Sequence, residues 1–251
     1  MSVGITDRYC ILLMTASSEN GQPLRHVITE RAALGKGNMN LVRAGLALVP
    51  NRHFRKKFIA LQERCRSQVT LVPRLGEDEN LPHLTLLQGW FAAAAPFDRV
   101  IKNLQKTLRQ AGFLPKLKLI DIRYNEPGWY FLLVEKEQWL AELQRHSLKL
   151  LLKHAQPAPV GHERATERYT PLELENDRKY GYRFIGDAFL PHITLGRTES
   201  GQEAGLEALL PDLWDESGIN SEQGIESIAI YAVGEHGAYR ASLCIEHLRS
   251  P

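Results

Sequence analysis

Two nearly identical six-residue phrases, one in each half of the 251-residue chain, are the feature that most constrains its fold. The first is Leu81-Pro82-His83-Leu84-Thr85-Leu86 and the second is Leu190-Pro191-His192-Ile193-Thr194-Leu195, so they differ only by Leu for Ile. Successive side chains of a β-strand point to opposite faces. Each phrase therefore predicts a strand that anchors an apolar row on one face and presents an imidazole beside a hydroxyl on the other.

The polar residues of the two phrases predict acid–base chemistry at a shared site. Histidine has an unperturbed pKa near 6.5, so of His83 and His192 one can accept a proton while the other donates one. The hydroxyls of Thr85 and Thr194 can donate hydrogen bonds to an oxygen that gains negative charge in a transition state. Arg197, just after the second phrase, would add a bidentate anion contact. Provided that the strands face one groove, these residues predict a metal-free phosphoryl-transfer site.

The rest of the composition argues against a metal centre and against bulk nucleic-acid binding. The sequence contains no His-Glu-x-x-His and no Cys-x-x-Cys spacing, and its three cysteines, Cys10, Cys65 and Cys244, lie far apart. They are expected to be reduced thiols of a cytoplasmic protein. The 31 basic and 29 acidic residues give a net charge of only +2, so any anion site must be local.

No part of the sequence predicts contact with a membrane. Its longest apolar runs are too short to span a bilayer, and the N-terminus lacks the basic region and apolar core of a signal peptide. We therefore expect a cytoplasmic location and no membrane partner.

The remaining periodicity predicts alternating strands and helices. Strands are expected at residues 41–49, 68–75, 82–91, 117–124, 129–135, 225–233 and 239–247, and helices after the N-cap Asn51 and at residues 97–111, 138–154 and 202–210. This order predicts an α+β protein in which two sheets carry helices on one side. Residues 1–39, which include a possible strand at residues 9–14, are treated as an N-terminal extension, and residues 40–251 as a single domain.

One long segment, at about residues 156–184, is expected to be an insertion with a functional or mobile loop. Within it, residues 177–183 alternate basic and aromatic side chains that could stack on bases and meet phosphates, although a surface hairpin is the preferred interpretation. Tyr182, Tyr231 and Tyr239 could each stack on a base or pack equally well in the core.

At its two His-x-Thr phrases the chain resembles the two-histidine (2H) phosphoesterase superfamily, also called the LigT-like or 2′–5′ RNA ligase-like group. The signature of that family is two His-x-Thr motifs, each followed by an apolar residue, and residues 83–86 and 192–195 match it position by position. The resemblance implies a bilobal, pseudo-twofold α+β fold with two antiparallel sheets lining a central groove and helices on the outer faces. It also implies phosphodiesterase activity on 2′,3′-cyclic or related cyclic phosphates, or on 2′–5′ linkages, of RNA or nucleotides.

The resemblance further implies the roles of the residues. One histidine would activate water and the other would protonate the departing ribose oxygen; we prefer His192 as base and His83 as acid, and the roles exchange in the ligation direction. Thr85 and Thr194 complete the catalytic set, and Arg197 and Tyr239 are assigned to substrate binding. No cofactor or metal is expected, and the protein is expected to be a monomer.

Three alternatives remain open at this point. The groove could bind a nucleotide or RNA without catalysis, although binding alone does not require two titrating groups. The same chemistry could run in the direction of RNA 2′–5′ ligation, but no ATP-binding segment is visible to drive it. The phrases could also be purely structural, which their near-identity disfavours.

Overall fold

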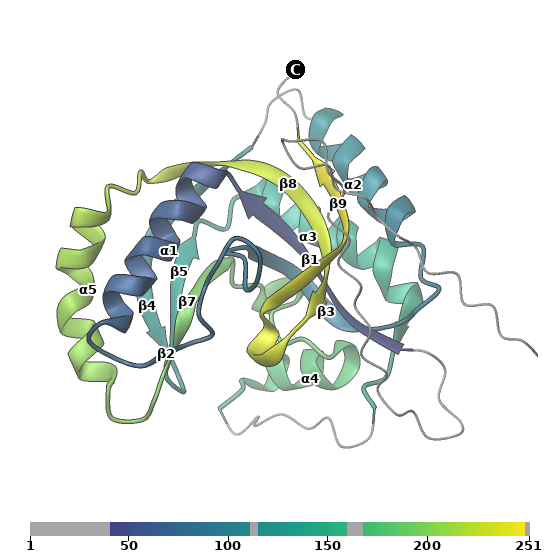
Figure 1. Cartoon of the computed structure of the whole chain (residues 1–251). Coiled ribbons are helices and arrows are strands. Elements are labelled where there is room, and N and C mark those ends of the chain that lie inside the picture. Colours follow the sequence, from purple (N-terminus) through teal and green to yellow (C-terminus); the bar gives the residue numbers. More distant parts are fainter. Residues whose placement is uncertain (1–40, 111–114, 160–167, 249–251) are drawn as a thin grey trace, which may run out of the picture. The chain divides into compact units, whose positions relative to one another are not determined.

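The computed structural model describes residues 41–110, 115–159 and 168–248 of the chain (Figure 1). The predicted strand at residues 9–14 and the extension at residues 1–39 lie outside these ranges, so the domain boundary at residue 40 stays a prediction. None of the helices in the described ranges is both long and apolar enough to cross a membrane.

The predicted α+β class is confirmed. The strands are β1 (Leu41–Pro50), β2 (Leu71–Val72), β3 (Leu84–Ala92), β4 (Lys116–Asn125), β5 (Trp129–Val134), β6 (Ala155–Gln156), β7 (His192–Thr198), β8 (Glu222–Val233) and β9 (Tyr239–His247). The α-helices are α1 (Arg52–Arg66), α2 (Phe97–Gln110), α3 (Gln138–Leu151), α4 (Pro171–Tyr180) and α5 (Glu203–Ser217). Most of these bounds lie within two residues of the prediction.

The strands pair antiparallel throughout, and the two expected sheets are the two halves of one hydrogen-bonded network. One half holds β6, β3, β1, β8 and β9, and the other holds β4, β5, β7 and β2. The halves join where β4 pairs with the start of β8, and again where Leu84 of β3 pairs with Ile193 of β7. These two residues hold the same place in the two phrases, so the phrases meet directly.

Each half of the sheet has its own pair of helices (Figure 1). Helices α1 and α5 contact each other beside β2 and β7, whereas α2 and α3 lie against β3, β8 and β9. Helix α1 begins as predicted, because the side chain of Asn51 accepts a hydrogen bond from the backbone N–H of Phe54 at 3.0 Å. Its apolar stripe of Phe54, Phe58, Leu61 and Cys65 is buried in the main core.

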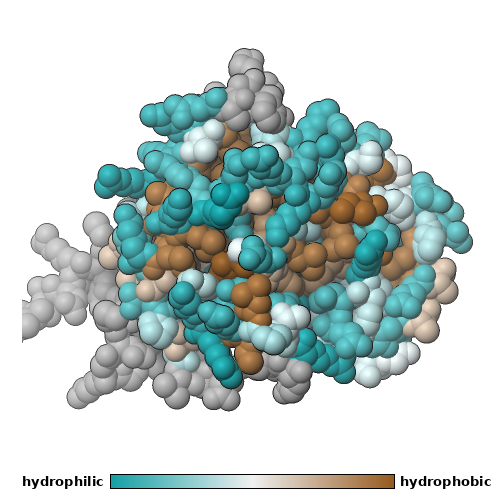
Figure 2. Space-filling view, turned by 180° about the vertical axis from the view of Figure 1, so that it is seen from behind, coloured by the Kyte–Doolittle hydropathy of each residue, from teal (hydrophilic) through white to brown (hydrophobic). Residues whose placement is uncertain are grey.

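Hydrophilic side chains cover much of the surface in the view of Figure 2, with apolar side chains gathered between them. Among the described residues, five large apolar side chains are exposed, and Ile120 is the most exposed of them. Scattered apolar residues of this kind are normal on a protein surface.

Three predicted elements are wrong: the strand at 68–75, the helix at 202–210 and the hairpin at 177–183. The strand expected at 68–75 shrinks to β2, because the backbone at Pro73 and Leu75 bonds to a side chain instead of a strand. The helix expected at 202–210 continues through Pro211, because Leu213 and Trp214 beyond the proline pack against the core, and it ends at Gly218 in the left-handed conformation.

The hairpin expected at 177–183 is instead the end of helix α4 and the turn that follows it. Thr170 and Glu173 form a capping box, in which the Thr170 side chain accepts from the Glu173 N–H and the Glu173 side chain accepts from the Thr170 N–H. Pro171 occupies the first turn and Gly181 ends the helix at φ 73°. These start and stop signals outweigh the alternation of basic and aromatic residues.

Candidate active site

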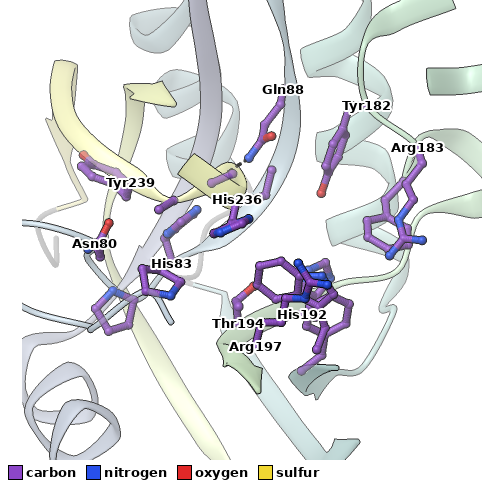
Figure 3. A pocket seen from close by; sticks show the side chains of 18 of the residues that line it. Asn80, His83, Gln88, Tyr182, Arg183, His192, Thr194, Arg197, His236 and Tyr239 are labelled. Atoms are coloured by element: carbon purple, nitrogen blue, oxygen red, sulfur yellow. Dashed lines mark hydrogen bonds between the residues drawn. The ribbon is translucent and has the colours of Figure 1, made fainter. Parts of the chain in front are cut away.

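Both phrases line one pocket of about 390 Å³ (Figure 3). All six residues predicted for the site are among its lining residues, namely His83, Thr85, His192, Thr194, Arg197 and Tyr239. Figure 3 shows His83 on one side of the pocket and His192, Thr194 and Arg197 on the other. The structure thus brings the predicted residues together, while their roles in catalysis and binding stay predictions.

The Leu-Pro-His part of each phrase orients its own imidazole. The Nδ1 atom of His83 lies 2.7 Å from the carbonyl oxygen of Leu81, and that of His192 lies 2.7 Å from the carbonyl oxygen of Leu190. Because a carbonyl can only accept, Nδ1 carries the hydrogen in the neutral ring. Nε2 is then the proton acceptor of each ring. His83 lies one residue before β3, whereas His192 begins β7.

A β-bulge at the last residue of each phrase shapes the pocket wall. Between β3 and β1 the pairing skips Leu86, and between β7 and β5 it skips Leu195. A bulge inserts one residue and so changes which later side chains share a face. This explains why Gln88 and Arg197, each five residues after its histidine, both line the pocket with the phrases.

The carbonyl of each bulge residue is satisfied by a buried glutamine from a helix. Gln144 of α3 donates to the Leu86 oxygen at 3.0 Å, and Gln62 of α1 donates to the Leu195 oxygen at 2.6 Å. The two side chains are almost fully buried. We call Gln62 and Gln144 the bulge glutamines.

Each of the bulge glutamines also holds the segment that leads into the other phrase. Gln62 donates to the oxygen of Pro73 at 2.8 Å and accepts from the N–H of Leu75 at 2.7 Å, just upstream of the first phrase. In the same way, Gln144 bonds to the Phe184 oxygen at 2.9 Å and the Gly186 N–H at 3.1 Å, just upstream of the second phrase. Each glutamine therefore links the bulge of one phrase to the segment before the other phrase, and we call these hydrogen bonds the crosswise ties.

The surroundings of the two histidines differ. The Nε2 atom of His83 lies 3.1 Å from the hydroxyl of Tyr231, and the ring of Tyr239 lies edge-on at 5.4 Å. His192 instead stacks on Phe131 with ring centres 3.9 Å apart, and Phe184 meets it edge-on at 5.2 Å. Within the described part of the chain, Nε2 of His192 has no hydrogen-bond partner.

Burial lowers the pKa of both histidines. The pKa of His83 falls from 6.5 to about 4, mainly because burial penalises the charged ring. That of His192 also falls to about 4, again mainly through burial, with smaller contributions from the positive charges of Arg183 and His83. Both rings are thus neutral at pH 7 in the empty pocket. A bound phosphate anion would raise both pKa values by favouring the charged form.

The lowered pKa values predict a loss of stability in acid. Between pH 6.5 and 4, His83 and His192 bind protons in the unfolded chain but stay neutral in the folded protein. The free energy of unfolding is therefore highest above pH 6.5 and falls as the pH drops toward 4. We expect each of the two residues to account for roughly 3 kcal/mol of that loss. Urea unfolding at several pH values measures it. The double variant His83→Gln/His192→Gln should show a flatter dependence, and an unchanged slope would contradict the prediction.

Among the described residues, three arginines bring positive charge to the pocket, and Arg197 is the one that was predicted as a site residue. Its Nε donates to the Pro127 oxygen at 3.0 Å. Arg43 of β1 and Arg183 also line the pocket. The guanidinium of Arg183 lies 4.2 Å from the centre of the Phe184 ring and 3.6 Å from a carboxylate oxygen of Glu173.

The other residues that the sequence analysis missed come from distant segments. Trp129 and His236 line the pocket and meet edge-on at 5.6 Å, with Phe131 and Phe184 beside His192. Tyr182 lines the pocket, as one of its two proposed roles requires, whereas Tyr231 is fully buried behind the wall. A detectable signal existed for the bulge glutamines, because each is a polar residue on the apolar face of a predicted helix.

Within the described ranges, no group of three or more His, Cys, Asp or Glu side chains is arranged to hold a metal ion. The pocket wall holds imidazoles, hydroxyls, guanidinium groups and aromatic rings. Hydroxyls and guanidinium groups donate hydrogen bonds to anionic oxygens, and aromatic rings can stack on a base.

No protein-family model matches the chain, and no curated protein sequence matches it. The fold is similar to E. coli LigT complexed with 3′-AMP, at 15% identity and a TM-score of 0.44 over 84% of this chain and 99% of that chain. It is similar to E. coli LigT in apo form at 16% identity and a TM-score of 0.44 over 82% and 97%. Usb1 from Kluyveromyces marxianus with uridine monophosphate matches at 11% identity and a TM-score of 0.36 over 84% and 98%. These likenesses concern the fold alone.

Proposed function

We propose that this chain is a 2H phosphoesterase: a metal-independent phosphodiesterase that hydrolyses 2′,3′-cyclic or related cyclic phosphates, or 2′–5′ linkages, in RNA or nucleotides. One observation carries the proposal. Two histidines, each with Nδ1 bound by its own phrase, line the same pocket together with both threonine hydroxyls. A pocket that only binds an anion needs no such pair of proton acceptors.

The reaction follows from the two imidazoles. Nε2 of His192 removes a proton from a water molecule whose oxygen forms the new bond to phosphorus. The bond from phosphorus to the ribose oxygen breaks, and that oxygen takes the proton from Nε2 of His83. Each transfer of this kind contributes typically about 10²–10⁴-fold. The protons then redistribute through solvent and restore the starting forms.

The difference between the two surroundings supports these roles. His192 has a free acceptor nitrogen within the described structure, and the nearby charge of Arg183 favours its neutral form. His83 has the Tyr231 oxygen at 3.1 Å, which can accept a hydrogen bond from a protonated ring. His192 therefore suits the base and His83 the acid in hydrolysis.

The remaining pocket residues suit a phosphate with a nucleoside attached. Thr85, Thr194 and Arg197 would donate to phosphate oxygens, where hydrogen bonds gain strength as negative charge develops. Tyr239 is assigned to contact with the base or sugar, although only 4% of this residue is exposed. Tyr182 and Trp129 line the pocket as well and are further candidates for stacking. A cytoplasmic location and a monomeric state remain part of the proposal.

The test is a panel of nucleoside 2′,3′-cyclic phosphates and 2′–5′-linked dinucleotides, with 3′–5′ dinucleotides as the matched control. We expect turnover of at least one member of the first two groups, unchanged by EDTA, and the product identified by whether a 2′- or a 3′-phosphate remains. Nucleotide binding without turnover of any member would replace the proposal with the binding-module alternative. Loss of activity in EDTA would exclude a metal-independent mechanism.

A further inference from the structure

A buried tyrosine hydroxyl lies directly behind the wall of the pocket at His83. Tyr231 is 0% exposed and is not among the lining residues. Its hydroxyl oxygen lies 3.1 Å from Nε2 of His83, 3.3 Å from Oγ1 of Thr85 and 2.9 Å from Nε2 of Gln88. All three partners line the pocket, so Tyr231 can influence a substrate only through them.

A glycine lets the tyrosine reach these partners across an intervening strand. Gly45 of β1 pairs with Gln88 of β3 on one side and with Tyr231 of β8 on the other. A Cβ atom at position 45 would lie 2.4 Å from Cζ of Tyr231. The ring therefore occupies the space that a side chain at position 45 would fill, and it stacks on Tyr239 with ring centres 4.6 Å apart. Glycine within a strand commonly marks such a close approach.

The hydrogen bonds of the Tyr231 hydroxyl to its three partners depend on the protonation state of His83. The hydroxyl has one hydrogen and two acceptor lone pairs, and the amide nitrogen of Gln88, which can only donate, takes one lone pair. One hydrogen and one lone pair then remain for His83 and Thr85. Burial raises the pKa of Tyr231 to about 12, so the hydroxyl keeps its hydrogen.

The protonation state of His83 decides which partner binds the remaining hydrogen of the tyrosine hydroxyl and which binds its remaining lone pair. When the ring is neutral, Nδ1 donates to Leu81 and Nε2 can only accept, so the tyrosine hydrogen points to His83 and Thr85 can donate to the tyrosine oxygen. When Nε2 carries a proton, it donates to the tyrosine oxygen until the leaving oxygen takes that proton, and the tyrosine hydrogen meanwhile turns to Oγ1 of Thr85. The hydrogen of Thr85 is then released toward the pocket.

We propose that Tyr231 is a positioning residue that makes Thr85 donate a hydrogen bond into the pocket only when His83 carries the proton that the leaving group needs. This inference deepens the proposed function and rests on it for the kinetic consequence. Thr85 then donates a hydrogen bond to a phosphate oxygen only while His83, the acid, is protonated. The second phrase has no equivalent, because His192 is backed by the ring of Phe131.

Several charged or titratable groups besides Tyr231 lie near His83 and bear on its titration. Tyr239 from β9 meets its ring, and Arg43 from β1, His192 from β7 and Arg183 after α4 line the same pocket. The lining carboxylate is that of Glu126, which is exposed and paired with Arg168 at 2.6 Å. Among the described residues, no carboxylate forms a hydrogen bond or ion pair with His83, which leaves the Tyr231 oxygen to accept from its protonated Nε2.

The first test uses no turnover: imidazole 15N NMR of the full chain during a pH titration in inorganic phosphate. The bond from a charged imidazole to the tyrosine oxygen is stronger than the bond to the neutral ring, so Tyr231→Phe should lower the pKa of His83 by roughly one unit and shift its Nε2 resonance. His192 should titrate as before. Tyr130→Phe is the matched control, since it also removes a buried tyrosine hydroxyl, one that donates to the Glu203 oxygen at 3.0 Å away from the pocket.

The second test is a double-mutant cycle on the substrate found by the panel. Tyr231→Phe should lower kcat about tenfold, and combining it with Thr85→Val should cost less than the product of the two single losses, because both changes break one chain of hydrogen bonds. Combining Tyr231→Phe with Thr194→Val should multiply the two losses. Unchanged titration of His83 in Tyr231→Phe, or independent losses with Thr85→Val, would overturn the inference. The NMR result stands even if no panel member is turned over, so the failure of the proposed function is distinguished from the failure of this inference.

Discussion

Replacing either His83 or His192 with glutamine is expected to lower kcat on the order of 10²–10⁴-fold while the protein stays folded. Glutamine roughly keeps the size of the side chain but can neither remove nor supply a proton near neutral pH, so each variant loses one of the two proton transfers. Single-turnover rates of His83→Gln and His192→Gln measure the loss. His146→Gln is the control, because His146 is only partly buried and hydrogen-bonds to Asn103 at 2.8 Å outside the pocket.

A change of leaving group separates the two roles. A substrate that releases p-nitrophenolate hardly needs an acid, so it should restore much of the rate in His83→Gln and little in His192→Gln. The opposite pattern would exchange the assignments of acid and base. Activity within tenfold of the wild type in either variant would place the chemistry on other residues.

Removing a bulge glutamine is expected to destabilise the protein by about 3 kcal/mol or more. Gln62→Leu or Gln144→Leu keeps the volume of the side chain, but it leaves three buried backbone groups without a partner, and each such group costs about 1–3 kcal/mol. Urea unfolding of each variant measures the change in the free energy of unfolding. Gln138→Leu is the matched control on α3, because Gln138 is exposed and bonds only to Glu142 at 2.8 Å.

The same variants test whether the crosswise ties shape the pocket. We expect a lower kcat in both variants even where the protein remains folded, since each glutamine fixes the bulge in one phrase and the segment before the other. A loss of stability below about 1 kcal/mol would mean that water or a shifted backbone replaces the three bonds.

The strand pattern of the two phrases predicted the shared face of histidine and threonine, because alternation is a local property of the backbone. It could not predict which residues after each phrase line the pocket, since the bulges at Leu86 and Leu195 move Gln88 and Arg197 onto the face that carries the histidines and threonines. Arg197 was placed correctly from its position after the phrase, but Gln88 was missed. A bulge depends on pairing with another strand, and the sequence of one strand does not reveal it.

Residues from distant strands were harder still to foresee. Tyr231 reaches His83 only because Gly45 on the intervening strand leaves room for its ring, a fact that requires the strand order. The helix α4 was misread for a different reason, because its capping box was a local signal that the alternating basic and aromatic residues obscured. Its last turn nevertheless leads Tyr182 and Arg183 to the pocket, where the alternation had suggested nucleotide contacts.

The place of β8 in the sheet bears on how the molecule is made. This late strand lies between β1, the first strand described, and β4, so the centre of the sheet stays open until residues 222–233 have left the ribosome. A nascent chain that already contains both phrases still lacks Tyr231 and Tyr239. Pairings between such distant segments slow folding and expose unpaired strand edges meanwhile. The pocket is therefore among the last parts of this protein to come into existence during synthesis.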